Sequence, residues 1–404
     1  MSEQYKSEGR WWVSPYNFKP EVVAMRWRPA KVLIHDATLR DGEQTPGVVF
    51  RKGDKVRIAK ALDLVGVDRI EAGMPAVSAE DFEAIQEIAT LGLKAKIFSF
   101  ARAMNEDVDQ ALACGADGVV IEVPIGYPKL VTQFKWTWED VVRKTAPVIN
   151  YAKSKGLYAV FFPYDATRAR EEDLDAMLEF IMRESAPDSI GLVDTMGCAT
   201  PEAIAYLTRK YIDYTHLPVE IHTHNDFGMA VATELAAVGA GASVVHSCVN
   251  GLGERTGNAA LEELILALDL LYGANTGCDY DALPSLSALV SELSGIPIAQ
   301  NKPVVGEENY TRESGIGANL VVEDPLVMFA THPGLTGRKG KVVLGKKSGK
   351  LSIVYKLKEL GLGDLDDGQL SALLAMVKKQ GNERRCLIGN EEFAAMVSAI
   401  RGTK

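Results

Sequence analysis

The sequence predicts an α/β protein, a (β/α)₈ TIM barrel followed by a small linker subdomain and a C-terminal helical subdomain. Three observations predict this fold class. Short β-branched runs alternate with longer stretches of helical spacing from residue 31 to about residue 273. Eight such units follow one another in series. Polar segments with metal-ligand chemistry follow the first, seventh and eighth runs, and a parallel barrel collects its reactive residues at these strand ends.

The eight predicted strands are short apolar runs that begin at residues 32, 68, 95, 118, 158, 189, 219 and 243. Helical spacing lies between them, for example over Lys55–Leu64, Glu80–Leu91, Glu171–Met182 and Pro201–Tyr211. Ser78 and Thr200 precede two of these stretches and are suited to cap the helices. The series favours a closed parallel barrel, and an open doubly wound sheet is the alternative.

The pattern changes after residue 273. Residues 279–300 have helical spacing, residues 301–350 are rich in Gly, Pro and Lys, and residues 351–404 resume as two or three helices. We therefore predict an N-terminal extension (1–30), a catalytic barrel (31–278), a linker subdomain (279–350) and a helical subdomain (351–404). One run of positive charge indicates a solvated loop or, as the alternative, an anion site. It comprises Arg338, Lys339, Lys341, Lys346, Lys347 and Lys350.

Composition narrows the class of protein. The 404 residues are 47% hydrophobic and 24% charged, with a net charge of −10 and a pI near 5.3, so we expect no nucleic-acid partner. No run of 18 apolar residues predicts a membrane span, and the N-terminus has no apolar signal core. Five scattered cysteines without a CxxC pair indicate a reduced, cytoplasmic protein. They are Cys114, Cys198, Cys248, Cys278 and Cys386.

Three segments carry the chemistry. His35–Gln44 follows the first predicted strand, Ile221–Asp226 the seventh, and Asn250–Asn258 the eighth. These strands are neighbours in a closed barrel, so the three segments are expected to converge at one end of it.

His222 and His224 are two residues apart on a strand, so both imidazoles point to one face. Together with a carboxylate from the first strand they make a plausible site for a divalent cation, and Asn258 converges on the same end. Two hydrogen-bonded core histidines are the alternative. Arg40 precedes Asp41, and a guanidinium beside a metal suits a developing enolate or alkoxide. A salt-bridged arginine at the rim is the alternative for Arg40.

At these residues the chain resembles a known family. Asp36–Gly47, which reads DATLRDGEQTPG, resembles the signature of the Claisen-condensing branch of the DRE-TIM metallolyase superfamily. That branch contains 2-isopropylmalate, homocitrate and citramalate synthases. His222–Met229, Asn250–Asn258 and Asp194–Gly197 are similar to the same branch, and the resemblance covers residues 31–350.

The resemblance implies roles for individual residues. It makes Asp41, His222, His224 and Asn258 ligands or near neighbours of one divalent ion, Mg²⁺, Mn²⁺ or Zn²⁺. Arg40 would polarise the 2-oxo group, and Tyr164 and Glu43 are further catalytic candidates. The substrate-binding candidates are Gln44, Thr195, Phe162 and Glu254, and the candidates for binding acyl-CoA are Gly253 and Arg255.

The implied reaction joins an acyl-CoA, acetyl-CoA by the resemblance, to a 2-oxo acid, with hydrolysis of the thioester. The resemblance also implies a homodimer. Because the chain ends at residue 404, we expect no C-terminal regulatory domain and no control by leucine.

The chain departs from the family pattern in its proton-transfer residues. Gly317 stands where the linker usually has a histidine after E-S-G-I, and His332 lies in what reads as a plain turn. Phe162 and Tyr164 replace the Ser and Glu of the family's F-S-P-E-D strand, and Pro124–Lys129 lacks a histidine found in many synthases. A phenol with a usual pKa of about 10 is a poor base near neutral pH. We therefore expect a synthase-like enzyme with an altered substrate, one with a larger or more apolar side chain.

Two other functions fit the same residues. A carbon–carbon lyase would run the reverse reaction on a related hydroxy acid or hydroxy-acyl-CoA, although Gly251–Glu254 lacks the loop cysteine of hydroxymethylglutaryl-CoA cleavage. A non-catalytic scaffold on the same fold would need a decayed metal site, and every expected ligand is present.

Overall fold

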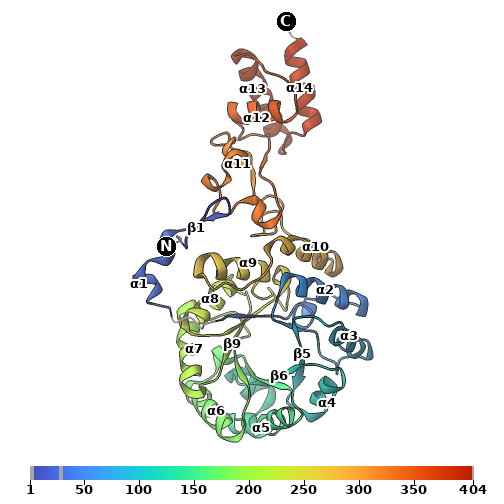
Figure 1. The fold of residues 1–404 in the computed structure, drawn as a ribbon, viewed down its shortest axis with the longest axis vertical. Coiled ribbons are helices and arrows are strands. Elements are labelled where there is room, and N and C mark those ends of the chain that lie inside the picture. The colour runs from blue at the N-terminus through green and yellow to red at the C-terminus, as the bar shows by residue number, and fades with distance from the viewer. Residues whose placement is uncertain (1–3, 27–30, 403–404) are drawn as a thin grey trace. The chain divides into compact units, whose positions relative to one another are not determined.

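The structure, a computed structural model, describes residues 4–26 and 31–402. The described residues form two compact units (Figure 1). Residues 15–26 and 31–298 make the first, and residues 4–14 and 299–402 make the second.

The first unit is a closed barrel of eight parallel strands. Each strand pairs with its neighbours in sequence, and β10 closes the barrel by pairing with both β9 and β3. This confirms the predicted TIM barrel and excludes the open sheet, in which the first and last strands would not pair. The strands are β3 (Leu33–Asp36), β4 (Arg69–Glu71), β5 (Lys96–Arg102), β6 (Gly118–Pro124), β7 (Tyr158–Tyr164), β8 (Ser189–Asp194), β9 (Val219–Thr223) and β10 (Val244–Ser247).

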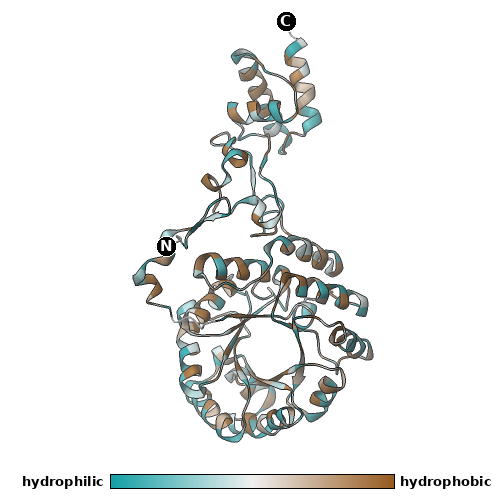
Figure 2. Ribbon diagram, in the orientation of Figure 1, coloured by the Kyte–Doolittle hydropathy of each residue, from teal (hydrophilic) through white to brown (hydrophobic). Residues whose placement is uncertain are grey.

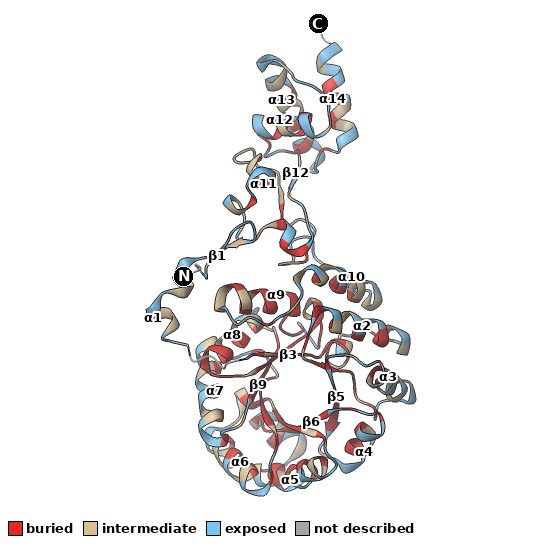
Figure 3. Ribbon diagram, viewed as in Figure 1, coloured by how far each residue is buried: buried red, intermediate tan, exposed pale blue. Residues whose placement is uncertain are grey.

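Helices surround the strands. Each carries hydrophilic and hydrophobic residues, and the buried positions concentrate on the strands and the inner helix faces (Figures 2 and 3). The side chains of Ser78 and Thr200 cap two helices by accepting from the amides of Asp81 and Ala203. The helices are α2 (Lys52–Val65), α3 (Ala79–Ala89), α4 (Asn105–Ala113), α5 (Trp138–Ser154), α6 (Glu171–Glu184), α7 (Pro201–Thr215), α8 (Ala230–Ala240) and α9 (Leu261–Leu266).

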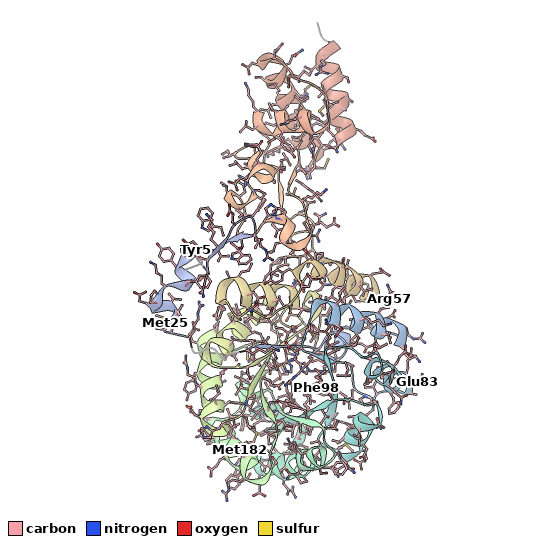
Figure 4. The ribbon with its side chains drawn as sticks, viewed as in Figure 1. Tyr5, Met25, Arg57, Glu83, Phe98 and Met182 are labelled. Carbon is pink, nitrogen blue, oxygen red and sulfur yellow. The ribbon has the colours of Figure 1, made fainter. Side chains whose placement is uncertain are left out.

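The barrel interior has an apolar side and an ionised side. Phe98, Phe100, Val120, Val160, Phe162 and Val193 pack together inside β5 to β8. Phe98 lies in the middle of the barrel in Figure 4. The inward residues of β3, β4, β9 and β10 are instead charged or titratable, and they include His35, Arg69, Glu71, Glu220 and His246, all buried. The polar side therefore needs internal partners.

Glu220 supplies most of those partners. Its carboxylate accepts from Arg69 at 2.7 Å, from Ser189 at 2.6 Å and pairs with His246 at 2.9 Å. Burial, together with His35, lowers the pKa of His246 to about 4, so this imidazole is neutral. His35 stacks on His246 with ring centroids 4.1 Å apart and planes 5° from parallel. The charge of Glu220 is thus compensated by Arg69, and the neutral imidazole of His246 adds a hydrogen bond.

The second unit joins the N-terminal strands to the linker region. β1 (Lys6–Ser7) and β2 (Trp11–Trp12) form a hairpin, and the amide of Trp12 donates to the carbonyl of Ala330 at 2.8 Å. β11 (Thr311–Arg312) pairs in parallel with β12 (Lys341–Val342), near α11 (Leu320–Glu323). The last three helices share a core that includes Leu357, Leu373 and Phe393. They are α12 (Lys350–Glu359), α13 (Asp367–Arg384) and α14 (Asn390–Gly402).

The boundaries of the two units differ from the predicted domain boundaries. α1 (Pro20–Val23) and α10 (Leu283–Ser294) belong to the barrel unit, although the sequence places them in the extension and the linker subdomain. The side chain of Asn250 ties α10 to the barrel, its Nδ2 donating to the carbonyl of Ser287 at 2.9 Å.

The cysteines and the apolarity of the helices bear on the environment of the protein. All five cysteines are free. Among the described residues, no helix combines the length and the apolarity that crossing a membrane requires.

Replacing Glu220 tests the ionised side of the interior. Glu220→Leu leaves the guanidinium of Arg69 buried without its counter-charge, and we expect a loss of about 3–5 kcal/mol in the free energy of unfolding, measured with urea. Glu179→Gln is the control, since Glu179 and Arg183 form an exposed pair at 3.7 Å. This control should change the free energy by less than about 0.5 kcal/mol. Equal stability of the Glu220 variant and the wild type would contradict the ion network.

Candidate active site and metal centre

Three candidate ligands meet at the C-terminal end of the barrel. Asp41 follows β3, His222 lies on β9, and His224 lies just beyond β9. The Oδ2 atom of Asp41 is 3.2 Å from Nε2 of His222 and 3.7 Å from Nε2 of His224. All three side chains are buried, and one ligand atom from each lies within 4.8 Å of the others. The predicted ligands are thus brought together by the pairing of β3, β10 and β9.

Asn258 completes the group. Its Nδ2 donates to Oδ1 of Asp41 and to the carbonyl of Leu252, both at 3.0 Å. Its Oδ1 is buried without a hydrogen-bond partner among the described residues. An unpartnered buried oxygen costs free energy unless something binds it. Burial lowers the pKa of His224 to about 4, so its imidazole is in the neutral form that ligates metals. Two imidazoles, a carboxylate and an amide oxygen fit a divalent ion.

Arg40 lies against this group in a fixed position. It donates to Asp41 at 2.9 Å and to both oxygens of Glu71 at 2.9 and 3.2 Å, and its guanidinium lies 4.3 Å from the ring centre of Phe100. Burial opposes its charge, but the carboxylates of Glu71 and Asp41 raise the pKa of Arg40 further. The alternative of a salt-bridged rim arginine is right about the ion pairs, but the side chain is buried in the site, being only 9% exposed.

Glu71 was missed by the sequence analysis. Burial disfavours its charge, yet Arg40 and His35 lower the pKa of Glu71 to about 2. The signal was present, because Arg69 and Glu71 alternate with an apolar residue on a short strand. Inward charges on a barrel strand need partners, and such partners point to a site.

The glycine loop after β10 shapes the group of ligands. Gly253 has φ +142°, and a Cβ there would lie 2.1 Å from Nδ2 of Asn258 and 2.9 Å from Oδ1 of Asp41. A Cβ on Gly257, at φ +79°, would lie 1.8 Å from the carbonyl oxygen of Gly251. Only glycine fits at these two positions, at Gly253 because the loop lies against the candidate ligands and at Gly257 because the loop folds back on its own backbone.

Two other predicted residues pair with groups other than the candidate ligands. Glu43 accepts from the amide of Phe50 at 2.8 Å and pairs with Lys55 at 2.6 Å. Arg255 pairs with Asp226 at 2.9 Å and so joins the loops after β9 and β10. Neither contact touches a candidate ligand.

The remaining rim residues are more open. Gln44 and Glu254 are exposed. The hydroxyl of Thr195 accepts from the amide of Asp165 at 2.7 Å. These three positions surround the site without joining the ligand cluster.

Phe162 and Tyr164 line the apolar side of the site. The ring of Phe162 lies 5.5 Å from that of His222 and 6.4 Å from that of Phe100. A side chain on Gly191 would collide with Phe162, so the barrel leaves room for this large ring. Burial, with the charges of Glu122 and Asp165, raises the pKa of Tyr164 above its usual value. Tyr164 therefore stays a protonated phenol and is no base.

Glu122 is a second residue that the sequence analysis missed. It lies on β6 in register with Phe162 on β7. Burial, helped by the charges of Asp41, Glu71 and Glu254 and opposed by Arg40, raises the pKa of Glu122 to about 7. The signal was a single glutamate inside an apolar run, Gly118–Pro124. The sequence analysis gave the beginning of this run but assigned no role to Glu122.

In the linker region, a glycine stands where the family usually has a histidine, as the sequence indicated. Gly317 has φ +67°, a conformation that suits glycine. His332 caps a turn, its Nδ1 accepting from the amide of Gly334 at 3.0 Å. The imidazole of His332 is thus engaged in the plain turn that the sequence predicted.

The fold and the clustered ligands define a class of protein. A closed parallel barrel with Asp, His, His and Asn at the C-terminal ends of its strands is a barrel-enzyme scaffold with a candidate site for one divalent ion.

Comparisons with known proteins identify the family. The family model described as HMGL-like matches residues 31–290. Homocitrate synthase AksA of Methanopyrus kandleri is 42% identical over 93% of this chain and 95% of its own. The 2-isopropylmalate synthase of Methanocaldococcus jannaschii is 38% identical over 93% of this chain and 72% of its own. The chain belongs to the HMGL-like family, which confirms the predicted DRE-TIM resemblance and makes it an enzyme of the kind that these synthases represent.

A solved structure agrees with the fold. The HMG-CoA lyase of Bacillus subtilis has a TM-score of 0.61 at 20% identity, covering 69% of this chain and 98% of that chain. At this identity the likeness concerns the barrel alone.

Replacing Gly253 tests the geometry of the ligand group. Gly253→Ala should displace Asn258 and Asp41, and we expect the variant to lose the rise in Tm that Mn²⁺ gives the wild type. Gly277→Ala is the matched control, since Gly277 has φ +80° but no atom within 4 Å of an added Cβ. Both variants carry backbone strain of about 1–3 kcal/mol. Gly253→Ala adds the clash with Asn258, so the comparison concerns the rise in Tm on adding the ion rather than Tm itself. A full response in Gly253→Ala would show that the loop does not shape the site.

Proposed function

We propose that this enzyme joins the acyl group of an acyl-CoA, acetyl-CoA in the first instance, to the carbonyl carbon of a 2-oxo acid. A divalent ion, Mg²⁺, Mn²⁺ or Zn²⁺, would be held by Asp41, His222, His224 and Asn258. The observation that carries the proposal is the guanidinium of Arg40, fixed between Glu71 and the ligand Asp41. The names of the relatives, homocitrate and 2-isopropylmalate synthases, support the same reaction class.

Positive charge is concentrated where the reaction develops negative charge. When bound, the ion supplies a Lewis acid for the oxygens of the 2-oxo acid. Arg40 uses three of its five N–H donors on Glu71 and Asp41, which leaves two for a substrate oxygen. Since both carboxylates hold it in place, little reorganisation is needed as the 2-oxo group becomes an alkoxide.

The proposed reaction forms a carbon–carbon bond and then hydrolyses the thioester. A base takes a proton from the methyl carbon of the acyl group, and the resulting enolate carbon bonds to the 2-oxo carbon. The alkoxide formed there takes up a proton. Water then hydrolyses the thioester, so the products are a 2-hydroxy dicarboxylic acid and the free thiol of coenzyme A.

The apolar side of the site favours an uncharged side chain on the 2-oxo acid. Phe100, Phe162 and Tyr164 form a wall beside Arg40 and His222. We propose on this ground a 2-oxo acid whose side chain is larger or more apolar than that of the leucine-pathway substrate. Gln44, Thr195 and Glu254 remain proposed substrate contacts, and Gly253 and Arg255 remain proposed contacts of acyl-CoA. A homodimer and a cytoplasmic location also remain predictions.

Thiol release tests the function. Purified enzyme with Mg²⁺ or Mn²⁺ is given acetyl-CoA and a panel of 2-oxo acids with apolar, aromatic and acidic side chains. We expect release with the apolar members, loss of it in chelator and its return with added ion. Asp41→Asn should abolish release and retain less ion by elemental analysis. No release with any 2-oxo acid, together with cleavage of hydroxy-acyl-CoA esters, would establish the lyase direction instead.

Replacing Tyr164 tests the role of its phenol. Tyr164→Phe removes one hydrogen-bond donor, and kcat should fall about tenfold, the value of one hydrogen bond in the transition state. Tyr206→Phe, on an exposed ring, is the control and should leave kcat unchanged. An unaltered kcat in Tyr164→Phe would mean that the ring only shapes the pocket.

A further inference from the structure

We propose that the carboxylate of Glu122 is the general base that removes the proton from the methyl carbon of the acyl group. This assignment rests on the proposed function and identifies its proton-transfer residue. Tyr164 occupies the position where the resemblance leads one to expect a glutamate, and its phenol cannot accept a proton near neutral pH.

The backbone places Glu122 inside the barrel, at the end where the ligands lie. Side chains alternate along β6, and its even positions face inward. A Cβ on Gly118 would lie 2.4 Å from the ring of Phe98, and Val120 belongs to the interior cluster. Glu122 follows two residues later, towards the C-terminal end. Its partner in register on β7 is Phe162, whose ring contacts the ligand His222.

Glu122 differs from the other inward carboxylates in having no fixed partner. Glu71 is held by Arg40, Glu220 by Arg69, and Asp41 by Arg40 and Asn258. Within the described part of the chain, no hydrogen bond or ion pair engages the carboxylate of Glu122. The residue is also only partly buried, so an incoming substrate can reach it.

The charges around Glu122 suit a base that works near neutral pH. Arg40, Asp41 and Glu71 act on it from the ligand side, Glu254 from the loop after β10, and Tyr164 lies on the neighbouring strand. Arg102, on β5, is instead engaged by Asp107 at 2.8 Å. With its pKa raised to about 7, Glu122 is ionised in part of the molecules and binds a proton more strongly than an ordinary carboxylate.

The proton passes from the methyl carbon of the acyl group to Glu122 and then to solvent. An oxygen of Glu122 takes the methyl proton, and the C–H electron pair becomes the enolate and then the new carbon–carbon bond. The protonated carboxyl returns its proton to solvent through its partly exposed face. The proposed base thus lies on β6, whereas the resemblance leads one to expect a glutamate on β7. The aromatic side chain of Tyr164 stands at that position on β7.

Glu122→Gln is the central variant, because it keeps the shape and removes the base. We expect kcat to fall about 10²–10⁴-fold with the KM of the 2-oxo acid little changed. The wild-type rate should rise with pH as the carboxyl ionises, and this limb should vanish in the variant. Glu122→Asp should recover part of the rate. Glu179→Gln is the exposed control, and the bound ion should be equal in all variants.

A second readout separates this assignment from the proposed function. Deuterium entering the acyl methyl group from D₂O reports enolisation even where no condensation follows. Exchange by the wild type and its loss in Glu122→Gln support the base whether or not thiol is released. If the wild type shows neither deuterium exchange nor thiol release, both proposals are overturned. Unchanged kcat and pH profile in Glu122→Gln, or a change confined to the KM or the choice of 2-oxo acid, overturn the base and make Glu122 a structural or specificity residue.

Discussion

The site depends on the interactions that the carboxylate of Asp41 makes with its neighbours. Its two oxygens are shared among Arg40, His222 and Asn258, which come from three separate parts of the chain. They meet only because β10 closes the barrel against β3 and β9. An uncompensated carboxylate would not stay ionised in this buried position, but here Arg40 and the two imidazoles outweigh burial and hold the pKa of Asp41 well below its usual value. The group around Asp41 therefore depends on closure of the barrel.

The rest of the interior follows from the need to compensate charge. Glu71 fixes Arg40, and Arg69 with His246 compensates Glu220 deeper in the barrel. Opposite them, Phe98, Phe100 and Phe162 fill the interior without polar atoms. A substrate at Arg40 thus has fixed charge on one side and aromatic rings on the other. In the proposed reaction, a 2-oxo acid would present its oxygens to the first side and its side chain to the second.

Much of the fold and the ligand group could be predicted from the sequence. Eight alternating units predict a barrel, and barrel topology then places strand ends one, seven and eight together, so the convergence of Asp41, His222, His224 and Asn258 could be predicted. Glu71 and Glu122 were missed because a glutamate in a short strand is ambiguous until the facing side of the strand is known. Glu43 was proposed from its motif, yet its carboxylate is taken by Lys55 and the Phe50 amide. Such competition between partners depends on geometry that spacing does not encode.

The most direct test of this view is the position of the ion. A crystal grown with Mn²⁺ should show one anomalous peak at about 2.0–2.3 Å from the carboxylate of Asp41 and from a ring nitrogen each of His222 and His224, with Oδ1 of Asn258 turned towards it. A peak between His35, Glu220 and His246, or no peak at either cluster in crystals of active enzyme, would contradict it.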